Sequence, residues 1–166
     1  MEIILKKNKV FCGLLLFLFL VSCNSKTIFS EFKTMPGTSW KANDKVSFEF
    51  EVQDTISPKN LFINIRNNNN YPYSNLYLIT ELNFANGTKV IDTLQYEMTD
   101  NLGNFLGSGF AEIKENKLFY KENKIFSVPG KHVFSVRQAM RKNGEIHPIE
   151  FLEGIQDVGF SIEKTK

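Results

Sequence analysis

Apolar and polar residues alternate with a period of two over most of the chain. The clearest run is "VSFEFEV", in which Val46, Phe48, Phe50 and Val52 share one face and serine and glutamate occupy the other. Each further run likewise places its own set of residues on one face. These sets are Leu61, Ile63 and Ile65; Leu76, Leu78, Leu82 and Phe84; Leu94, Tyr96 and Met98; His132, Phe134, Val136, Gln138 and Met140; and Val158, Phe160 and Ile162. This period is typical of half-buried β-strands.

Turn residues separate these runs. Asn-Gly pairs at 86–87 and 143–144 and a Pro-Gly pair at 129–130 predict tight turns, and residues 113–126 predict one strand or a pair. The total is seven to nine short strands without a helix. We therefore predict an all-β single domain, an antiparallel β-sandwich of immunoglobulin-like or jelly-roll-like type. Sixteen phenylalanines suit a core between two pleated sheets.

The first residues have the layout of a secretory signal. Lys6, Lys7 and Lys9 precede the apolar residues 10–21, a run shorter than the roughly 20 residues that a membrane-spanning helix needs. The residues Leu20-Val21-Ser22-Cys23 resemble the lipobox of bacterial lipoproteins, which implies that Cys23 carries lipid and begins the mature chain. The alternative is an ordinary secretory signal that happens to contain a cysteine. The expected segments are a removed signal (1–22), a lipid-anchored tether (23–39) and the sandwich domain (40–166).

Loss of the signal changes the charge and the cysteine count. It removes three of the 20 basic residues and one of the 18 acidic residues, which leaves 17 of each. A neutral domain lacks the field that would attract nucleic acid or anionic lipid headgroups. Cys12 leaves with the signal and Cys23 takes lipid, so no thiol remains for a disulfide, a metal or a nucleophile.

The sequence gives no support for catalysis. His132 falls on a strand face and His147 lies beside a proline in a loop, so both are interpreted as structural or surface residues. The motifs H-E-x-x-H and G-x-S-x-G, and a phosphate-binding glycine loop, do not occur. We expect no enzyme activity, no metal and no cofactor.

The most unusual stretch is "RNNNNYPYSN", residues 66–75. Asparagine tolerates left-handed backbone geometry, so a structural connection between two strands is favoured over a recognition loop. As a recognition loop it would offer Tyr71 and Tyr73 as contacts for a partner. A sugar-binding interpretation would use Tyr71, Tyr73 and Trp40 as stacking platforms, although Trp40 could equally close one end of the sandwich.

Several segments, in order, resemble one family. "RNNNNYPYSNLYL", "NKLFYKEN", "RQAMR" and "LEGIQDVGFSIEK" are similar to the gliding-motility lipoprotein family of type H (GldH) of Bacteroidota. The resemblance implies an outer-membrane lipoprotein that gliding and the associated type IX secretion machinery require, with an assembly or stabilising role and no reaction. It carries over one residue, the lipid-bearing Cys23. No acidic run follows that cysteine, so the resemblance favours a periplasm-facing anchor.

Two hypotheses on function follow. The first is a non-enzymatic accessory lipoprotein that docks on other envelope proteins through a sandwich face or an edge strand. The second is a carbohydrate-binding module that holds surface polysaccharide or peptidoglycan. Exposed aromatic rings on a concave face would support the second, whereas an apolar patch or an open strand edge would support the first.

Overall fold

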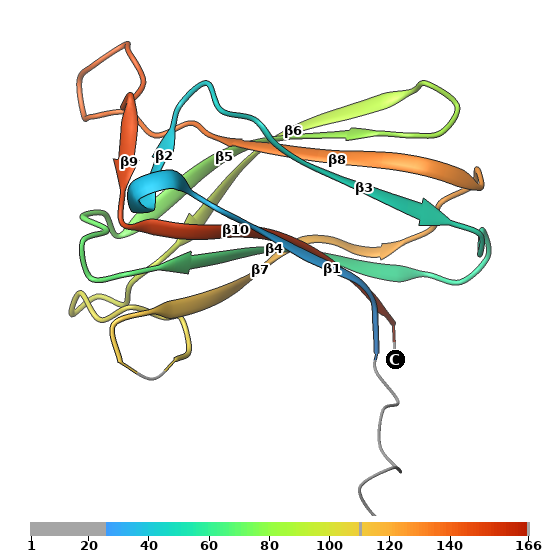
Figure 1. Ribbon diagram of the computed structural model, residues 1–166, viewed down its shortest axis with the longest axis horizontal. Helices are drawn as coiled ribbons and strands as arrows, with labels where there is room; N and C mark the ends of the chain where they lie inside the picture. The colour runs from blue at the N-terminus through green and yellow to red at the C-terminus, as the bar shows by residue number, and fades with distance from the viewer. Residues whose placement is uncertain (1–25, 110, 166) are drawn as a thin grey trace, which may run out of the picture.

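The computed structural model describes residues 26–109 and 111–165, so the predicted signal and Cys23 lie outside the described residues. Within these described residues, ten strands and one short 3-10 helix follow one another (Figure 1). Their bounds are β1 Thr27–Thr34, η1 Pro36–Thr38, β2 Ser39–Lys41, β3 Val46–Val52, β4 Lys59–Asn67, β5 Asn75–Asn83, β6 Lys89–Glu97, β7 Lys114–Lys124, β8 Gly130–Gln138, β9 Phe151–Glu153 and β10 Ile155–Lys164. Within the described part of the chain, no helix has the length and apolar character needed to cross a membrane.

Two four-stranded antiparallel sheets form a sandwich. Their strand orders are β1-β10-β4-β7 and β3-β8-β5-β6, and β2 and β9 form a two-stranded ribbon at one end. Among the eight long strands the first pairs with the last, the second with the seventh, the third with the sixth and the fourth with the fifth. This pairing is that of a jelly roll, so the structure selects it over the immunoglobulin-like alternative.

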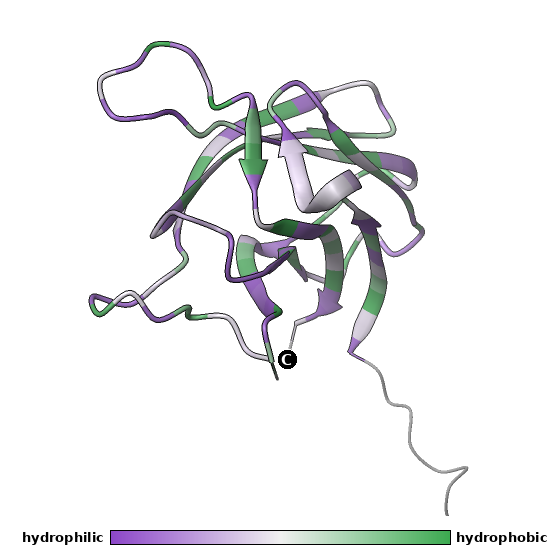
Figure 2. Cartoon of the chain, turned by 60° about the vertical axis from the view of Figure 1, so that its left-hand side comes forward, coloured by the Kyte–Doolittle hydropathy of each residue, from purple (hydrophilic) through white to green (hydrophobic). Residues whose placement is uncertain are grey.

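The core lies between the inner faces of the two sheets, and the predicted register is confirmed. Figure 2 shows the alternation as green and purple bands along the strands. Phe134 and Phe160 stack across the sandwich with ring centroids 4.1 Å apart, and Phe48 and Phe50 pack against the same ring of Phe160. Burial of each such side chain stabilises the fold by roughly 1.5–3 kcal/mol. The aromatic cluster therefore holds the two sheets together.

The prediction of a tether up to residue 39 is wrong, because residues 27–34 form β1 and pair with β10 along its whole length. A bulge between Thr27 and Phe29 interrupts the alternation of this strand. Two of its inward positions are the charged residues Glu31 and Lys33, which lie at the sheet edge where they reach solvent. An edge strand of this kind lacks the period-two signal. The first described strand begins at Thr27, only four residues after Cys23 in the sequence.

The edge strands of the two sheets face each other along both sides of the sandwich, and side chains bridge them. On one side the ammonium of Lys33 in β1 donates to the carbonyl of Ser47 in β3 at 2.6 Å. On the other, the hydroxyl of Tyr96 in β6 donates to the carbonyl of Phe119 in β7, also at 2.6 Å. A sheet edge that carries a charged side chain, or that is bridged by a side chain to the other sheet, discourages the addition of a further strand. Edge-strand docking is therefore less favoured than docking through the loops.

The loops lie at two ends, because successive long strands run in opposite directions. At the proximal end β1 begins and β10 ends, beside the loop 53–58 and residues 125–129. At the distal end lie the β2–β9 ribbon and the connections 68–74 and 139–150. In Figure 1 the proximal end is on the right, near the C mark, and the distal end is on the left.

Candidate functional site

The loop 68–74, which contains the asparagines and tyrosines, is ordered by its own side chains. The side-chain oxygen of Asn68 accepts from the N–H of Asn70 at 2.9 Å, and its carbonyl accepts from the N–H of Tyr71 at 3.2 Å. The hydroxyl of Tyr71 donates to the carbonyl of Asn75 at 2.6 Å. Its ring is buried and meets that of Tyr73 edge-on, with centroids 5.9 Å apart. Asparagine thus shapes this loop by local hydrogen bonds, as expected.

Gly154 fixes the loop to the rest of the distal end. Its φ of +80° lies in the left-handed region, and a Cβ at this position would stand 2.2 Å from the backbone nitrogen of Tyr71. Its carbonyl accepts from the N–H of Asn68 and its N–H donates to the carbonyl of Thr38, both at 2.9 Å. The junction of β9 and β10 therefore needs glycine, because backbone from the loop passes directly against it.

The connection 139–150 forms a second projecting lobe. The N–H of Ile149 donates to the carbonyl of Met140 at 2.8 Å, and the amide of Gln138 donates to the carbonyl of Ile149 at 2.6 Å, so the base of the lobe is closed. The predicted turn at Asn143-Gly144 is confirmed: Gly144 has φ +82° and the N–H of Glu145 donates to the carbonyl of Lys142. The lobe stands beside the loop 68–74.

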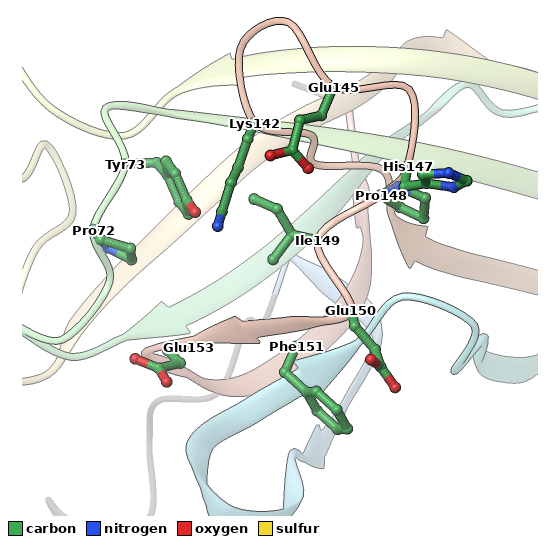
Figure 3. Close-up of a pocket in the computed structure, with 10 residues that line it drawn as sticks. All are labelled: Pro72, Tyr73, Lys142, Glu145, His147, Pro148, Ile149, Glu150, Phe151 and Glu153. Carbon is green, nitrogen blue, oxygen red and sulfur yellow. The ribbon is translucent and has the colours of Figure 1, made fainter.

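A cleft of about 420 Å³ separates these two loops; we call it the distal cleft. Its lining residues are Pro72, Tyr73, Lys142, Glu145, His147, Pro148, Ile149, Glu150, Phe151 and Glu153. Figure 3 shows Lys142 extending from the lobe toward Tyr73 on the facing wall, with Glu145 turned toward Ile149 and His147 at the far side. Phe151, from β9, is 53% exposed.

The chemistry of the distal cleft suits binding. It combines the partly buried ring of Tyr73 and the exposed ring of Phe151 with one lysine and three glutamates, so its charge is negative overall. Among residues 26–109 and 111–165, no group of three or more histidine, cysteine, aspartate or glutamate side chains is placed to hold a metal ion. The arrangement can accept an apolar segment that carries a basic group.

The structure corrects the candidate contacts. Trp40 is fully buried and its indole N–H donates to the carbonyl of Asp44 at 2.9 Å, so it closes the distal end of the sandwich and cannot be a stacking platform. Tyr71 is 3% exposed, and burial, with a smaller contribution from Tyr73, raises the pKa of its hydroxyl. Tyr73 alone of these three residues reaches the surface, in the distal cleft. A sugar site built on all three rings is therefore excluded.

Phe151, Lys142 and Glu145 were not predicted as site residues. Phe151 follows no period-two pattern, since β9 has only three residues, and its neighbour Leu152 takes the buried position. The charged residues around the Asn-Gly turn were the one available signal, and charges beside a turn are ordinary.

Comparison with known proteins assigns the chain to a family. Residues 27–162 match the family model described as GldH lipoprotein. The chain belongs to this family, which confirms the resemblance of its sequence segments. Because GldH proteins are described as lipoproteins, a lipid anchor holds the chain at a membrane of the cell envelope.

Two curated relatives are similar over most of their length. The gliding motility lipoprotein GldH homolog of Christiangramia forsetii is 49% identical over 144 residues, 87% of this chain and 88% of the relative. The gliding motility lipoprotein GldH of Flavobacterium johnsoniae is 44% identical over 151 residues, 91% of this chain and 93% of the relative. A solved family GH115 4-O-methyl-α-glucuronidase matches 87% of this chain and 18% of its own with 12% identity and a TM-score of 0.41, a likeness too weak to bear on function.

Proposed function

We propose that this protein is a non-enzymatic outer-membrane lipoprotein that gliding motility requires, and that it assists the assembly or stability of the gliding and type IX secretion machinery. It would be anchored through lipid on Cys23 and dock on another envelope protein. The observation that supports this proposal most is the identity of 44–49% over almost the whole chain to relatives named for gliding motility. The periplasm-facing orientation stays a prediction.

The distal cleft is the proposed docking surface. Its walls are pre-ordered, because Gly154 and the hydrogen bonds of Asn68 hold one loop while Gln138 closes the base of the other. A pre-ordered site avoids the entropic cost of ordering loops on binding. The exposed ring of Phe151 and the surplus of glutamates favour a partner segment with an apolar residue beside a lysine or arginine.

The test removes the aromatic rings of the cleft. Tyr73→Ala and Phe151→Ala should each reduce colony spreading and type IX secretion at unchanged membrane abundance. The thermal midpoint should stay close to wild type in Phe151→Ala, whose ring is exposed, and fall modestly in Tyr73→Ala, whose ring packs partly against the core. A matched control is Phe119→Ala on the outer face of β7, because Phe119 is 48% exposed and Phe151 53%. This control should spread normally. Full spreading of the Tyr73→Ala/Phe151→Ala double variant would exclude the cleft as the docking surface.

The carbohydrate-binding alternative is not favoured. Two of its three proposed platforms, Trp40 and Tyr71, are buried. Binding of the purified domain to peptidoglycan or surface polysaccharide in a pull-down, abolished by Tyr73→Ala, would reinstate it.

A further inference from the structure

The lipid anchor and the first strand are very close together in the sequence. Only Asn24, Ser25 and Lys26 separate Cys23 from Thr27, where β1 begins. Four residue steps of fully extended chain span at most about 14 Å. A lipid on Cys23 would therefore keep the start of β1 within about that distance of the membrane surface, and with it the neighbouring parts of the proximal end.

An exposed isoleucine lies at this same end. Ile56, at the tip of the loop 53–58, is 83% exposed. The loop around it is rigidly built: one carboxylate oxygen of Asp54 accepts from the N–H groups of Ile56 and Ser57, each at 3.0 Å. The ammonium of Lys59, itself almost fully buried, donates to the carbonyls of Asp54 and Ser57 at 2.8 and 2.9 Å and pairs with the Asp54 carboxylate at 3.5 Å. Four hydrogen bonds thus hold an apolar tip in solvent.

More exposed apolar side chains lie at this end, on segments next to the loop 53–58. Ile28, the bulged residue at the start of β1, is 45% exposed, and it shares a surface hollow with Pro58, Lys59 and Lys164. Ile125 follows the end of β7, where Lys124 pairs in register with Lys59, and is 46% exposed. We call Ile28, Ile56, Pro58 and Ile125 the proximal apolar surface. It lies beside the point where the chain arrives from Cys23.

We infer that the proximal apolar surface rests on the lipid bilayer, with Ile56 inserted among the headgroups, so that the sandwich stands on the membrane by its proximal end. The inference rests on the lipid anchor proposed at Cys23. Apolar side chains bind the interfacial zone of a bilayer in proportion to the apolar area that they bury there. A short tether favours the contact further, because the anchor holds the surface at a high effective concentration.

This orientation places the distal cleft away from the membrane. The ten residues of β10 run from one end of the sandwich to the other, about 30 Å at a rise of roughly 3.3 Å per residue. A partner could therefore reach the cleft without meeting lipid.

The test compares two equally exposed isoleucines at opposite ends. Ile56 is 83% exposed and Ile146, in the lobe 139–150, is 82% exposed. Ile56→Cys and Ile146→Cys are each made in the full lipidated chain, labelled with an environment-sensitive fluorophore and reconstituted into vesicles of phosphatidylethanolamine and phosphatidylglycerol. A nitroxide-bearing lipid is then added as a quencher. The natural cysteines do not compete, because Cys12 is expected to leave with the signal and Cys23 to carry lipid.

The label at position 56 should show blue-shifted emission and quenching several-fold stronger than the label at position 146. Equal quenching at the two positions would overturn the inference, and so would a blue shift at position 56 without quenching, because that result indicates contact with protein such as a second copy of the chain. Failure of the anchor itself is distinguishable: the protein would not float with the vesicles, and Cys23 of the wild-type chain would take up the label.

Discussion

At the scale of single residues, Gly154 decides the shape of the distal end. Gly154→Ala would put a Cβ against the backbone of Tyr71 while φ stays near +80°. Gly144→Ala is the matched control, because Gly144 has φ +82° and open space around it. The control should lose about 1–2 kcal/mol of unfolding free energy from backbone strain alone. Gly154→Ala should lose about 3 kcal/mol or more, because the loop must also move. Urea unfolding measures both, and equal losses would contradict the close approach.

His132 is a second single residue on which the stability of the fold depends. Its ring is fully buried among Phe50, Phe84 and Phe126. Because the carbonyl of Val128 can only accept, Nε2 at 3.1 Å carries the hydrogen of the neutral ring, and Nδ1 has no hydrogen-bond partner among the described residues. Burial, chiefly, lowers the pKa of His132 from its ordinary value.

This environment predicts a pH dependence of stability. The unfolded chain takes up a proton at about pH 6.5, whereas folded His132 resists it until a lower pH. The stabilisation is therefore complete above about pH 6.5 and falls as the pH decreases toward the folded pKa. Urea unfolding from pH 7.5 to pH 5 should show this loss in the wild type and a flatter profile in His132→Phe. The exposed His147 is the control, since His147→Phe should keep the wild-type profile; an unchanged profile in His132→Phe would refute the assignment.

At the scale of elements, period-two alternation was sufficient wherever a strand is long and places mostly apolar residues on one face and mostly polar residues on the other. It located β3, β4, β5, β8 and β10 with the correct inward faces. It failed for β2 and β9, which have three residues each, and for β1, which a bulge interrupts. It also does not reveal that Phe62, on an outer face, is 7% exposed, because Phe119 and Lys117 from β7 cover it.

The candidate site was predictable only in part for a similar physical reason. The asparagine-tyrosine loop was singled out correctly as a feature, and the structure places it at the distal cleft. Whether Tyr71 or Tyr73 faces outward depends on Gly154 and the carbonyl of Asn75, and Gly154 is more than 80 residues away in the sequence. A local pattern cannot carry that information, so the sequence offered both tyrosines as contacts, although Tyr71 is buried and Tyr73 lines the cleft.

The membership of β1 in the sandwich makes a prediction at this scale. Phe29 packs against Phe50 and Phe160 with ring centroids 5.8 and 6.1 Å apart. Phe29→Ala should therefore cost about 1–3 kcal/mol, against about 3–5 kcal/mol for a fully buried ring such as Phe134. Ser30→Ala, on the exposed face of the same strand, is the control and should change stability by less than about 0.5 kcal/mol. A tether would tolerate both changes, so an unchanged thermal midpoint in Phe29→Ala would show that β1 does not belong to the folded domain.

At the scale of the whole molecule, the anchor and the fold should be separable, because every described strand lies at or after Thr27 and Cys23 precedes it in the sequence. Cys23→Ala should abolish labelling with palmitate and release the protein from the membrane fraction, while the thermal midpoint of the domain remains that of the wild type. Cys12→Ala is the matched control, because Cys12 lies in the segment expected to be removed, and it should label normally. Several acyl chains give stable anchoring, whereas a domain without them has no comparable hold on a bilayer. Labelling that persists in Cys23→Ala would place the lipid elsewhere, and membrane retention without labelling would show that the proximal apolar surface or a protein partner holds the domain unaided.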